Sequence, residues 1–159
     1  MSKAAKIVSV LAICACVLTA YLLASARFQA VILSVKVESA ADRLDAFRSL
    51  AETIERGDLG AGQFGTLDSD DPADYAFVTY AVELKGRSPL TAEWAVLCLS
   101  PLGGDVAFLP GVATDIPPFG ARTLTGTLLT RTADAGQERH LWAEYYLFGR
   151  SLSAVAEAP

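Results

Sequence analysis

The chain has 159 residues, of which 52% are hydrophobic, and its 18 acidic residues outnumber its 13 basic ones for a net charge of −5. All the acidic residues lie in residues 27–159, which carry 11 basic residues and therefore a net charge of −7. An acidic surface argues against binding nucleic acid, which attracts clustered Lys and Arg. It argues equally against a domain that lies flat on an anionic membrane.

The first predicted element is the uncharged segment from Ile7 to Ala26, which is 20 residues long. At about 1.5 Å per residue, a helix of that length covers about 30 Å, the thickness of the hydrocarbon core of a bilayer. Lys3 and Lys6 precede it, so the positive-inside rule places residues 1–6 in the cytoplasm and everything after Arg27 outside. The sequence thus predicts a cell-membrane protein with a single transmembrane helix over residues 7–26.

Two alternatives use the same segment. Ala24-Ser25-Ala26 has the small-x-small form of a signal-peptidase site, so the segment could be a cleaved signal peptide. Its apolar core is longer than the usual 7–15 residues or so of such a peptide, which favours a retained anchor. Lipidation at Cys14 or Cys16 is the other alternative, although neither is preceded by the full Leu-x-small pattern of lipoprotein signals. All three interpretations export the same domain.

Residues 27–159 are enough for one domain with its own core. Cys98 is the one cysteine of that part, so the domain forms no internal disulfide. The first strand begins near Phe28 or Ala30, and alternation predicts a buried face made of Val31, Leu33, Val35 and Val37. The alternative is that the membrane helix continues to about Leu33.

An amphipathic helix is expected over about residues 40–56, with an apolar stripe at steps of three and four residues. Ser39 is a typical start signal and Gly57 a typical end signal. We expect the stripe to dock on the domain core; a partner-binding helix is the alternative. Residues 57–73 follow as a glycine-rich loop that becomes acidic towards its end.

From Tyr75 onward the pattern is a series of short strands separated by turns. Strands of this length with no helical pattern between them predict an antiparallel β-sandwich of six or seven strands. Two prolines place residues 116–120 in a turn, because each proline removes a donor from the ladder. The strands are expected over residues 75–85, 91–100 (apolar on both faces), 106–109, 123–132, 140–148 and 151–155.

Two stretches carry a family resemblance. Residues 80–92, Tyr-Ala-Val-Glu-Leu-Lys-Gly-Arg-Ser-Pro-Leu-Thr-Ala, resemble the strand-turn-strand of bacterial Ig-like modules of the CARDB and fibronectin-III-like type. Residues 116–125, Ile-Pro-Pro-Phe-Gly-Ala-Arg-Thr-Leu-Thr, are similar to the Pro-Gly turn before a threonine-rich strand in those modules. The chain departs from them in Gly86, where they often place Asn, and in its extra helix. The whole chain resembles uncharacterised bacterial single-pass membrane proteins with an Ig-like extracellular domain. The resemblance implies a fold more than a function.

Residues that could carry catalysis are few. His140 is the one histidine, so either a Cys98–His140 pair or a serine triad would depend on it. No Gly-x-Ser-x-Gly turn is present, and His and Cys are too few for a typical zinc site. We interpret Cys98 as a buried thiol and His140 as a residue at a sheet rim, so no catalytic, cofactor-binding or metal residues are assigned.

Ligand binding has two candidate locations. Asp68, Asp70, Asp71 and Asp74 have the composition of a calcium loop without EF-hand spacing, and a solvated turn capped by Asp71 is the simpler interpretation. Several aromatics could form a carbohydrate platform, although they fall on alternate sides of their strands: Trp94, Trp142, Tyr145, Tyr146 and Phe148. Residues 102–105, Leu-Gly-Gly-Asp, are too short to hold a phosphate and predict a hairpin turn.

These observations predict a mainly β, Ig-like sandwich with one accessory helix behind a membrane anchor. The function expected is that of a non-enzymatic interaction domain, without a cofactor, that contacts another envelope protein close to the membrane. The alternative is an envelope domain that binds carbohydrate or calcium. Nucleic acid is not an expected partner.

Overall fold

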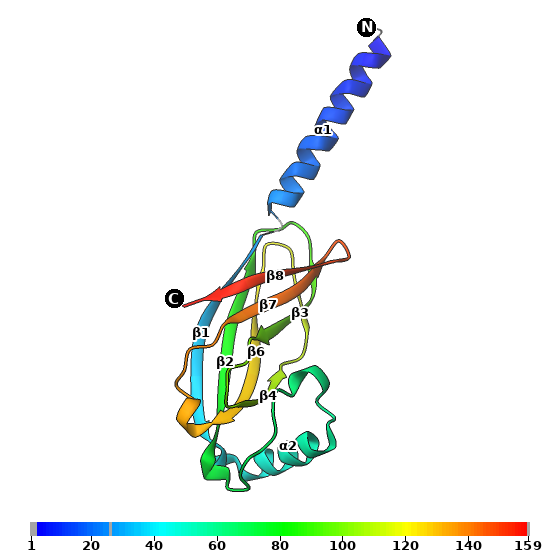
Figure 1. Cartoon of the computed structure of the whole chain (residues 1–159). Helices are drawn as coiled ribbons and strands as arrows, with labels where there is room; N and C mark the ends of the chain where they lie inside the picture. Colours follow the sequence, from blue (N-terminus) through cyan, green and yellow to red (C-terminus); the bar gives the residue numbers. More distant parts are fainter. Residues whose placement is uncertain (1–2, 26, 159) are drawn as a thin grey trace.

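The computed structural model describes residues 3–25 and 27–158, with side chains over residues 5–21 and 27–158. It is mainly β, with helix α1 (Lys3–Ser25) projecting from one end of a sheet domain (Figure 1). Over this described part, no helix combines the length and apolar character needed to cross a membrane. Ala26, which closes both the predicted span and the predicted cleavage site, lies outside the described residues.

Strand β1 (Phe28–Ser39) runs the length of the domain and pairs antiparallel with β2 (Tyr75–Gly86). The register shifts between Ile32 and Ser34, so Leu33 is an extra residue in β1. Such a bulge reverses which residues face the core.

The prediction that Val31, Leu33, Val35 and Val37 form the buried face of β1 is therefore wrong. Phe28 and Ala30 are buried, whereas Leu33, Val35 and Val37 are about half exposed. The sequence alternates through this region, but the extra residue shifts the alternation by one position, and no element covers the second half of the strand.

The eight strands form one curled sheet in the order β4-β6-β2-β1-β8-β7-β3-β5, one or two strands more than predicted. β4-β6-β2-β1 and β8-β7-β3-β5 face each other as two layers. β1 and β8 join the layers through two parallel residue pairs, so the sandwich is not purely antiparallel. The other strands are β3 (Ala92–Leu99), β4 (Asp105–Pro110), β5 (Thr114–Ile116), β6 (Ala121–Arg131), β7 (Leu141–Leu147) and β8 (Arg150–Glu157).

The main core lies between the two layers, and in two strands it follows the alternation of apolar residues in the sequence. β2 contributes Val78, Val82 and Leu84, all fully buried, and β7 contributes Leu141, Ala143, Tyr145 and Leu147. Gly86, at the end of β2, lies against the Phe28 ring, and a Cβ at this position would overlap that ring. Because residue 86 has no Cβ, the Phe28 ring can pack against its backbone, and the start of β1 lies in the core.

The predicted helix forms as a short 3-10 turn (Ala40–Arg43) followed by α2 (Leu44–Arg56). The Ser39 hydroxyl accepts a hydrogen bond from the Ala41 N–H, and Gly57 ends the helix in the left-handed conformation with φ 71°. α2 packs its apolar stripe on the outer face of the first layer, where Phe47 lies 5.6 Å from the Tyr75 ring. Phe47, Leu50 and Ile54 are buried, so the stripe belongs to the fold.

Replacement of Phe47 tests this packing. We expect Phe47→Ala to lower the free energy of unfolding by about 3–5 kcal/mol, because it leaves a cavity beside Tyr75. Glu52→Ala, on the exposed face of α2, should change it by less than about 0.5 kcal/mol. Denaturant unfolding measures both. Equal, small effects would mean that the stripe is a free partner-binding surface.

Candidate functional site

The most unusual surface of the domain is an apolar strip on β1. We call Leu33, Val35 and Val37 the β1 strip; their exposed fractions are 54%, 51% and 51%. Burying an apolar side chain of this size completely is worth about 1.5–3 kcal/mol. Covering the exposed halves of all three would therefore yield on the order of 3 kcal/mol.

The register explains why the strip is uncovered. Val35 is opposite Tyr80 and Val37 is opposite Val78, and both β2 residues belong to the main core. Side chains directly opposite each other in an antiparallel pair lie on the same face of the sheet. Val35 and Val37 consequently lie on the core side of the first layer, beyond the reach of the second layer.

The backbone edge of β1 is also open beside the strip. β8 pairs with β1 only at Ala30 and Val31, and no other strand of the described chain pairs with the far edge of β1 from Ile32 to Ser39. Figure 1 shows β8 crossing the upper half of β1 and leaving the lower half free. An exposed edge presents unpaired N–H and C=O groups to another chain.

The opposite face of this half-strand is charged. Lys36 Nζ lies 2.8 Å from Glu38 Oε1, and Arg43 NH1 lies 3.7 Å from Glu38 Oε2. The hydrogen bond from Lys36 lowers the pKa of Glu38, so this carboxylate stays ionised. Charged side chains on an edge strand limit its pairing with unrelated strands of other chains. A specific partner would then contact the apolar face of this half-strand.

Cys98 and His140 do not form a catalytic pair in the structure. His140 is exposed, with its ring 5.7 Å from Trp142. Cys98 is half-buried on the outer face of the second layer, not fully buried as predicted, because β3 is covered on one face alone. Burial, with a smaller contribution from the charge of Glu144, raises the pKa of this thiol to about 11.

The acidic loop separates its carboxylates. Asp68 pairs with Arg131, and Asp71 caps the turn by accepting a hydrogen bond from the Ala73 N–H at 2.9 Å, as predicted. The Tyr75 hydroxyl accepts hydrogen bonds from the N–H groups of Asp68 and Ser69. Across residues 3–25 and 27–158, no three His, Cys, Asp or Glu side chains gather in a way that could hold a metal ion.

Two open hollows of about 310 and 540 Å³ flank the ion pair of Asp68 and Arg131. Both lie at the end of the domain opposite α1. The guanidinium that they share is already paired with the Asp68 carboxylate. Both are open to solvent, unlike the enclosed pockets that are typical of small-molecule sites.

The aromatics considered as a carbohydrate platform face different ways, as their alternation in the sequence predicted, and form no common surface. Tyr145 is buried in the core, where its ring lies 4.6 Å from that of Phe28. Trp142 is half-buried and Tyr146 is 47% exposed, both on the outer face of the second layer. Trp94 and Phe148 lie near the end of the domain next to α1.

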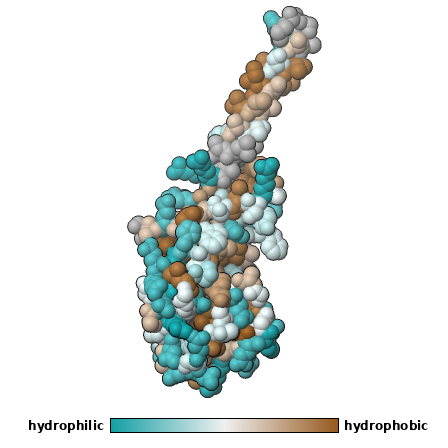
Figure 2. Space-filling model, in the orientation of Figure 1, coloured by the Kyte–Doolittle hydropathy of each residue, from teal (hydrophilic) through white to brown (hydrophobic). Residues whose placement is uncertain are grey.

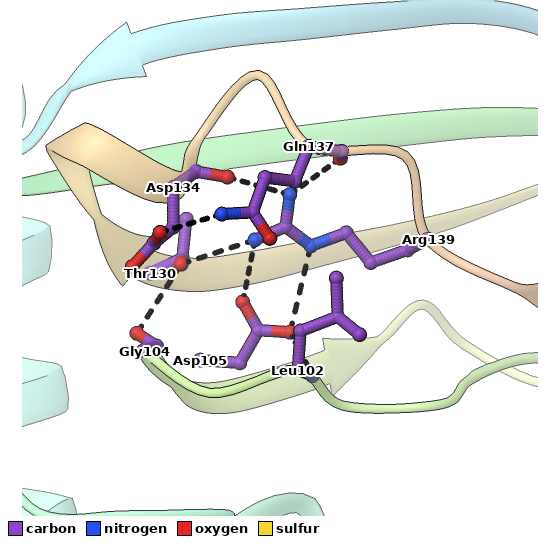
Figure 3. A network of polar contacts seen from close by, with 7 residues as sticks. All are labelled: Leu102, Gly104, Asp105, Thr130, Asp134, Gln137 and Arg139. Atoms are coloured by element: carbon purple, nitrogen blue, oxygen red, sulfur yellow. Dashed lines mark hydrogen bonds and ion pairs between the residues drawn. The ribbon is translucent and has the colours of Figure 1, made fainter.

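A buried ion pair, which the sequence analysis did not identify, holds the far end of the domain together (Figure 3). Arg139 NH2 lies 2.7 Å from Asp105 Oδ1, and neither side chain is exposed. Arg139 also donates to the Thr130 hydroxyl and the Asp134 carbonyl, and Asp105 Oδ2 accepts from the Leu102 N–H. The cluster therefore satisfies both charges with hydrogen bonds and links β4, β6 and the segment before β7.

This cluster corrects the predicted hairpin at residues 102–105. β3 and β4 belong to different layers and do not pair, so the turn crosses from one layer to the other. Asp105 fixes it by accepting from Leu102 N–H through its side chain and donating to Leu102 through its backbone. No local pattern reveals the pair, because Asp105 and Arg139 are 34 residues apart.

Comparisons with known proteins add a fold likeness alone. No protein-family profile and no curated protein matches the chain. Among solved structures, the chain is similar to an uncharacterised β-sandwich protein from Clostridium difficile 630, with 5% sequence identity and a TM-score of 0.31. The match covers 81% of this chain and 85% of that one. A likeness of this strength has no bearing on function.

Removing one partner of the buried pair should be costly. We expect Arg139→Met to lower the free energy of unfolding by about 3–5 kcal/mol, because Asp105 remains as a buried, uncompensated charge. Arg131→Met is the matched control: its pair with Asp68 is half exposed and should contribute about 0–1 kcal/mol. Denaturant titration distinguishes them, and similar losses in both variants would contradict the assignment.

Alkylation kinetics test the environment of Cys98. Raising the pKa from 9.0 to about 11 keeps the thiol protonated at neutral pH and reduces the reactive thiolate about 100-fold at mildly alkaline pH. In a Cys14→Ser/Cys16→Ser chain, we expect iodoacetamide to react that much more slowly with the folded than with the unfolded protein. Glu144→Gln should recover part of the rate. Equal rates in the folded and unfolded chain would disprove the shift.

Proposed function

We propose that this protein is a membrane-anchored, non-enzymatic interaction module whose β1 strip receives an extended segment of another envelope protein by strand addition. The observation that carries the proposal is the open edge of β1 beside Leu33, Val35 and Val37. In strand addition, main-chain hydrogen bonds supply affinity and alternate side chains supply specificity. The β1 strip offers both on one half-strand.

The strand order supports an Ig-like sandwich of the CARDB or fibronectin-III-like type. β1-β2-β6-β4 corresponds to the A-B-E-D sheet of such domains, and β3-β7-β8 to the C-F-G sheet. β5 adds a short strand beside β3, and α2 is inserted between the first two strands. Ig-like sheets commonly serve as interaction surfaces, although the fold alone assigns no role.

The proposed anchor, with the N-terminus in the cytoplasm and the domain outside, rests on the uncharged sequence segment of residues 7–26. Helix α1 covers this segment as far as Ser25. Its apolar side chains are exposed around the helix, with fractions of 58–66% from Ile7 to Leu18. The Ser9 and Thr19 hydroxyls donate to the carbonyls of Ala5 and Ala15 at 2.9 and 2.8 Å. Polar groups satisfied within the helix are what a lipid environment requires.

The same anchoring favours a different protein over a second copy as the occupant of the β1 strip. A two-fold pair of β1 edges would be antiparallel. Because β1 runs from the α1 end towards the far end of the domain (Figure 1), such a pair would direct one domain back into the membrane. A partner held in the same membrane needs little affinity, since tethering raises its effective concentration.

A non-enzymatic role is supported by the separation of the reactive groups. His140 is exposed beside Trp142, and Cys98 is protonated at neutral pH. The dispersed carboxylates and aromatics likewise give no specific support to calcium or carbohydrate as a ligand.

Site-specific photo-crosslinking in intact cells tests the proposal. With a photoreactive residue at Val37 of the full chain, we expect an adduct with a different envelope protein, identified by mass spectrometry. Adding Val35→Asp should reduce its yield several-fold, because the strip becomes charged while the fold keeps an exposed residue there. The same probe at Glu52 on α2 is the control.

The outcomes are distinct. An adduct of two copies of this chain would replace the proposed partner with self-association. No adduct at Val37, or the same adduct from Glu52, would contradict strand addition at the β1 strip.

A further inference from the structure

Three exposed aromatic residues share an unusual backbone conformation. Trp94, Phe119 and Phe148 have φ values of 54°, 53° and 53°, and they are the non-glycine residues with positive φ in the described chain. Their side chains are 70%, 64% and 63% exposed. A positive φ in a bulky residue costs of the order of 1–3 kcal/mol and persists where the surroundings impose it.

Hydrogen bonds impose that conformation at two of the three positions. The Trp94 N–H donates to Asp115 Oδ1 at 3.0 Å, and the Phe119 N–H donates to the Ser88 carbonyl at 2.9 Å. The fold therefore holds large apolar rings outward in water, where they contribute little to the core. A strained backbone that exposes an apolar ring to water suggests that the ring contacts something other than this domain.

The three rings lie at the end of the domain from which α1 emerges. Phe119 is in the turn before β6, and its neighbour Gly120 accepts from the N–H of Gly86, the residue opposite Phe28. Trp94 is near the start of β3, and Phe148 is at the tip of the β7–β8 hairpin (Figure 1). We call these three aromatics and the basic residues around them the proximal rim.

The basic residues of the proximal rim are exposed and pair with no carboxylate in the part of the chain that the structure describes: Arg27, Lys85, Arg87, Arg122 and Arg150. Glu93 and Asp115 lie on the same side of β3 and β5, and Asp115 accepts from the Trp94 N–H. Glu83, two residues before Lys85 on β2, and Glu157 are both paired in register with Val31 and are the other acidic residues beside the rim. Figure 2 shows hydrophilic side chains around the base of α1. Five basic residues therefore outnumber four acidic ones around the rim, although the domain as a whole is acidic.

The opposite end of the domain is acidic. α2, the acidic loop and the 3-10 turn Pro72–Asp74 lie there (Figure 1). Together with the 3-10 turn Ala40–Arg43 before α2, they carry nine of the 18 acidic residues: Asp42, Asp45, Glu52, Glu55, Asp58, Asp68, Asp70, Asp71 and Asp74. Charge is therefore separated along the long axis, with the positive end next to α1.

We propose that the proximal rim docks end-on to the anionic phospholipid headgroups of the membrane that α1 enters. This inference rests on the proposed anchoring of α1. Aromatic rings prefer the membrane–water interface, and each Lys or Arg near an anionic surface contributes about 1 kcal/mol. The proximal rim has both features: aromatic rings that point outward and basic side chains without a carboxylate partner. It also lies directly beside the proposed anchor.

End-on docking sets the height of the β1 strip. Val35 is seven residues beyond Phe28, and a strand rises about 3.3 Å per residue. The strip is then held about 23 Å above the rim, clear of the headgroups and facing one side. A partner segment in the same membrane would have to reach that height.

Fluorescence quenching by brominated lipid tests the proposal on the full chain. The chain is reconstituted in vesicles of equal phosphatidylcholine and phosphatidylglycerol, with bromine on the acyl-chain carbons nearest the headgroup. Trp94 is one of two tryptophans, and the other, Trp142, is half-buried on the outer face of the second layer, opposite Val155 of β8. We expect quenching of about half of the emission in the natural chain, and its loss in Trp94→Phe.

Charge variants separate docking from mere proximity. Arg87→Gln/Arg122→Gln should reduce the quenching several-fold, as should molar salt, which shortens the screening length to about 3 Å. The matched control Arg48→Gln/Arg56→Gln, on α2 at the other end, should leave the quenching unchanged. Equal quenching in vesicles of phosphatidylcholine alone would overturn the role of the anionic headgroup.

Flotation of the same vesicles after an alkaline wash distinguishes the two proposals. If the chain floats and Trp94 is unquenched, the rim proposal is wrong and the anchor stands. A chain that does not float overturns both. Quenching that persists unchanged in the charge variants would likewise reject electrostatic docking.

Discussion

The structure depends on one irregular pairing, that of β1 with β2, in which Leu33 is an extra residue. Before the bulge, Phe28 and Ala30 enter the core, and the Phe28 ring packs between Gly86 and Tyr145. After it, Val35 and Val37 lie on the same side of the sheet but beyond the second layer. A single added residue thus lets β1 begin in the core beneath α1 and continue as a partly uncovered edge.

The second layer explains why that edge stays open. β8 approaches β1 at two residue pairs alone, so the layers separate along the rest of β1. At the far end they are held instead by the buried pair of Asp105 and Arg139, whose hydrogen bonds connect both sides of the sandwich. Because this clamp lies away from β1, it stabilises the sandwich without closing the gap beside the β1 strip.

Periodicity predicted the elements whose patterns are local. The alternating core faces of β2 and β7, the stripe of α2 and its Gly57 end all follow from residue spacing. The bulge does not, because Val31-Ile32-Leu33 is continuously apolar and any of the three could be the extra residue. The pair of Asp105 and Arg139 and the proximal rim were missed because they bring together residues distant in sequence. Positive φ at Trp94, Phe119 and Phe148 has no sequence signal, since glycine is the residue expected there.

The sign of the charge connects the two proposals. A domain with a net charge of −7 is repelled by an anionic surface on average, but separation of charge along its axis makes one orientation favourable. Two residues separate α1 from β1, so the domain stays close to the end of α1. Contact at the rim would hold the domain in one orientation and keep the acidic end away from the membrane. The free edge of β1 would then face along the membrane surface, which is the direction from which another anchored protein can approach.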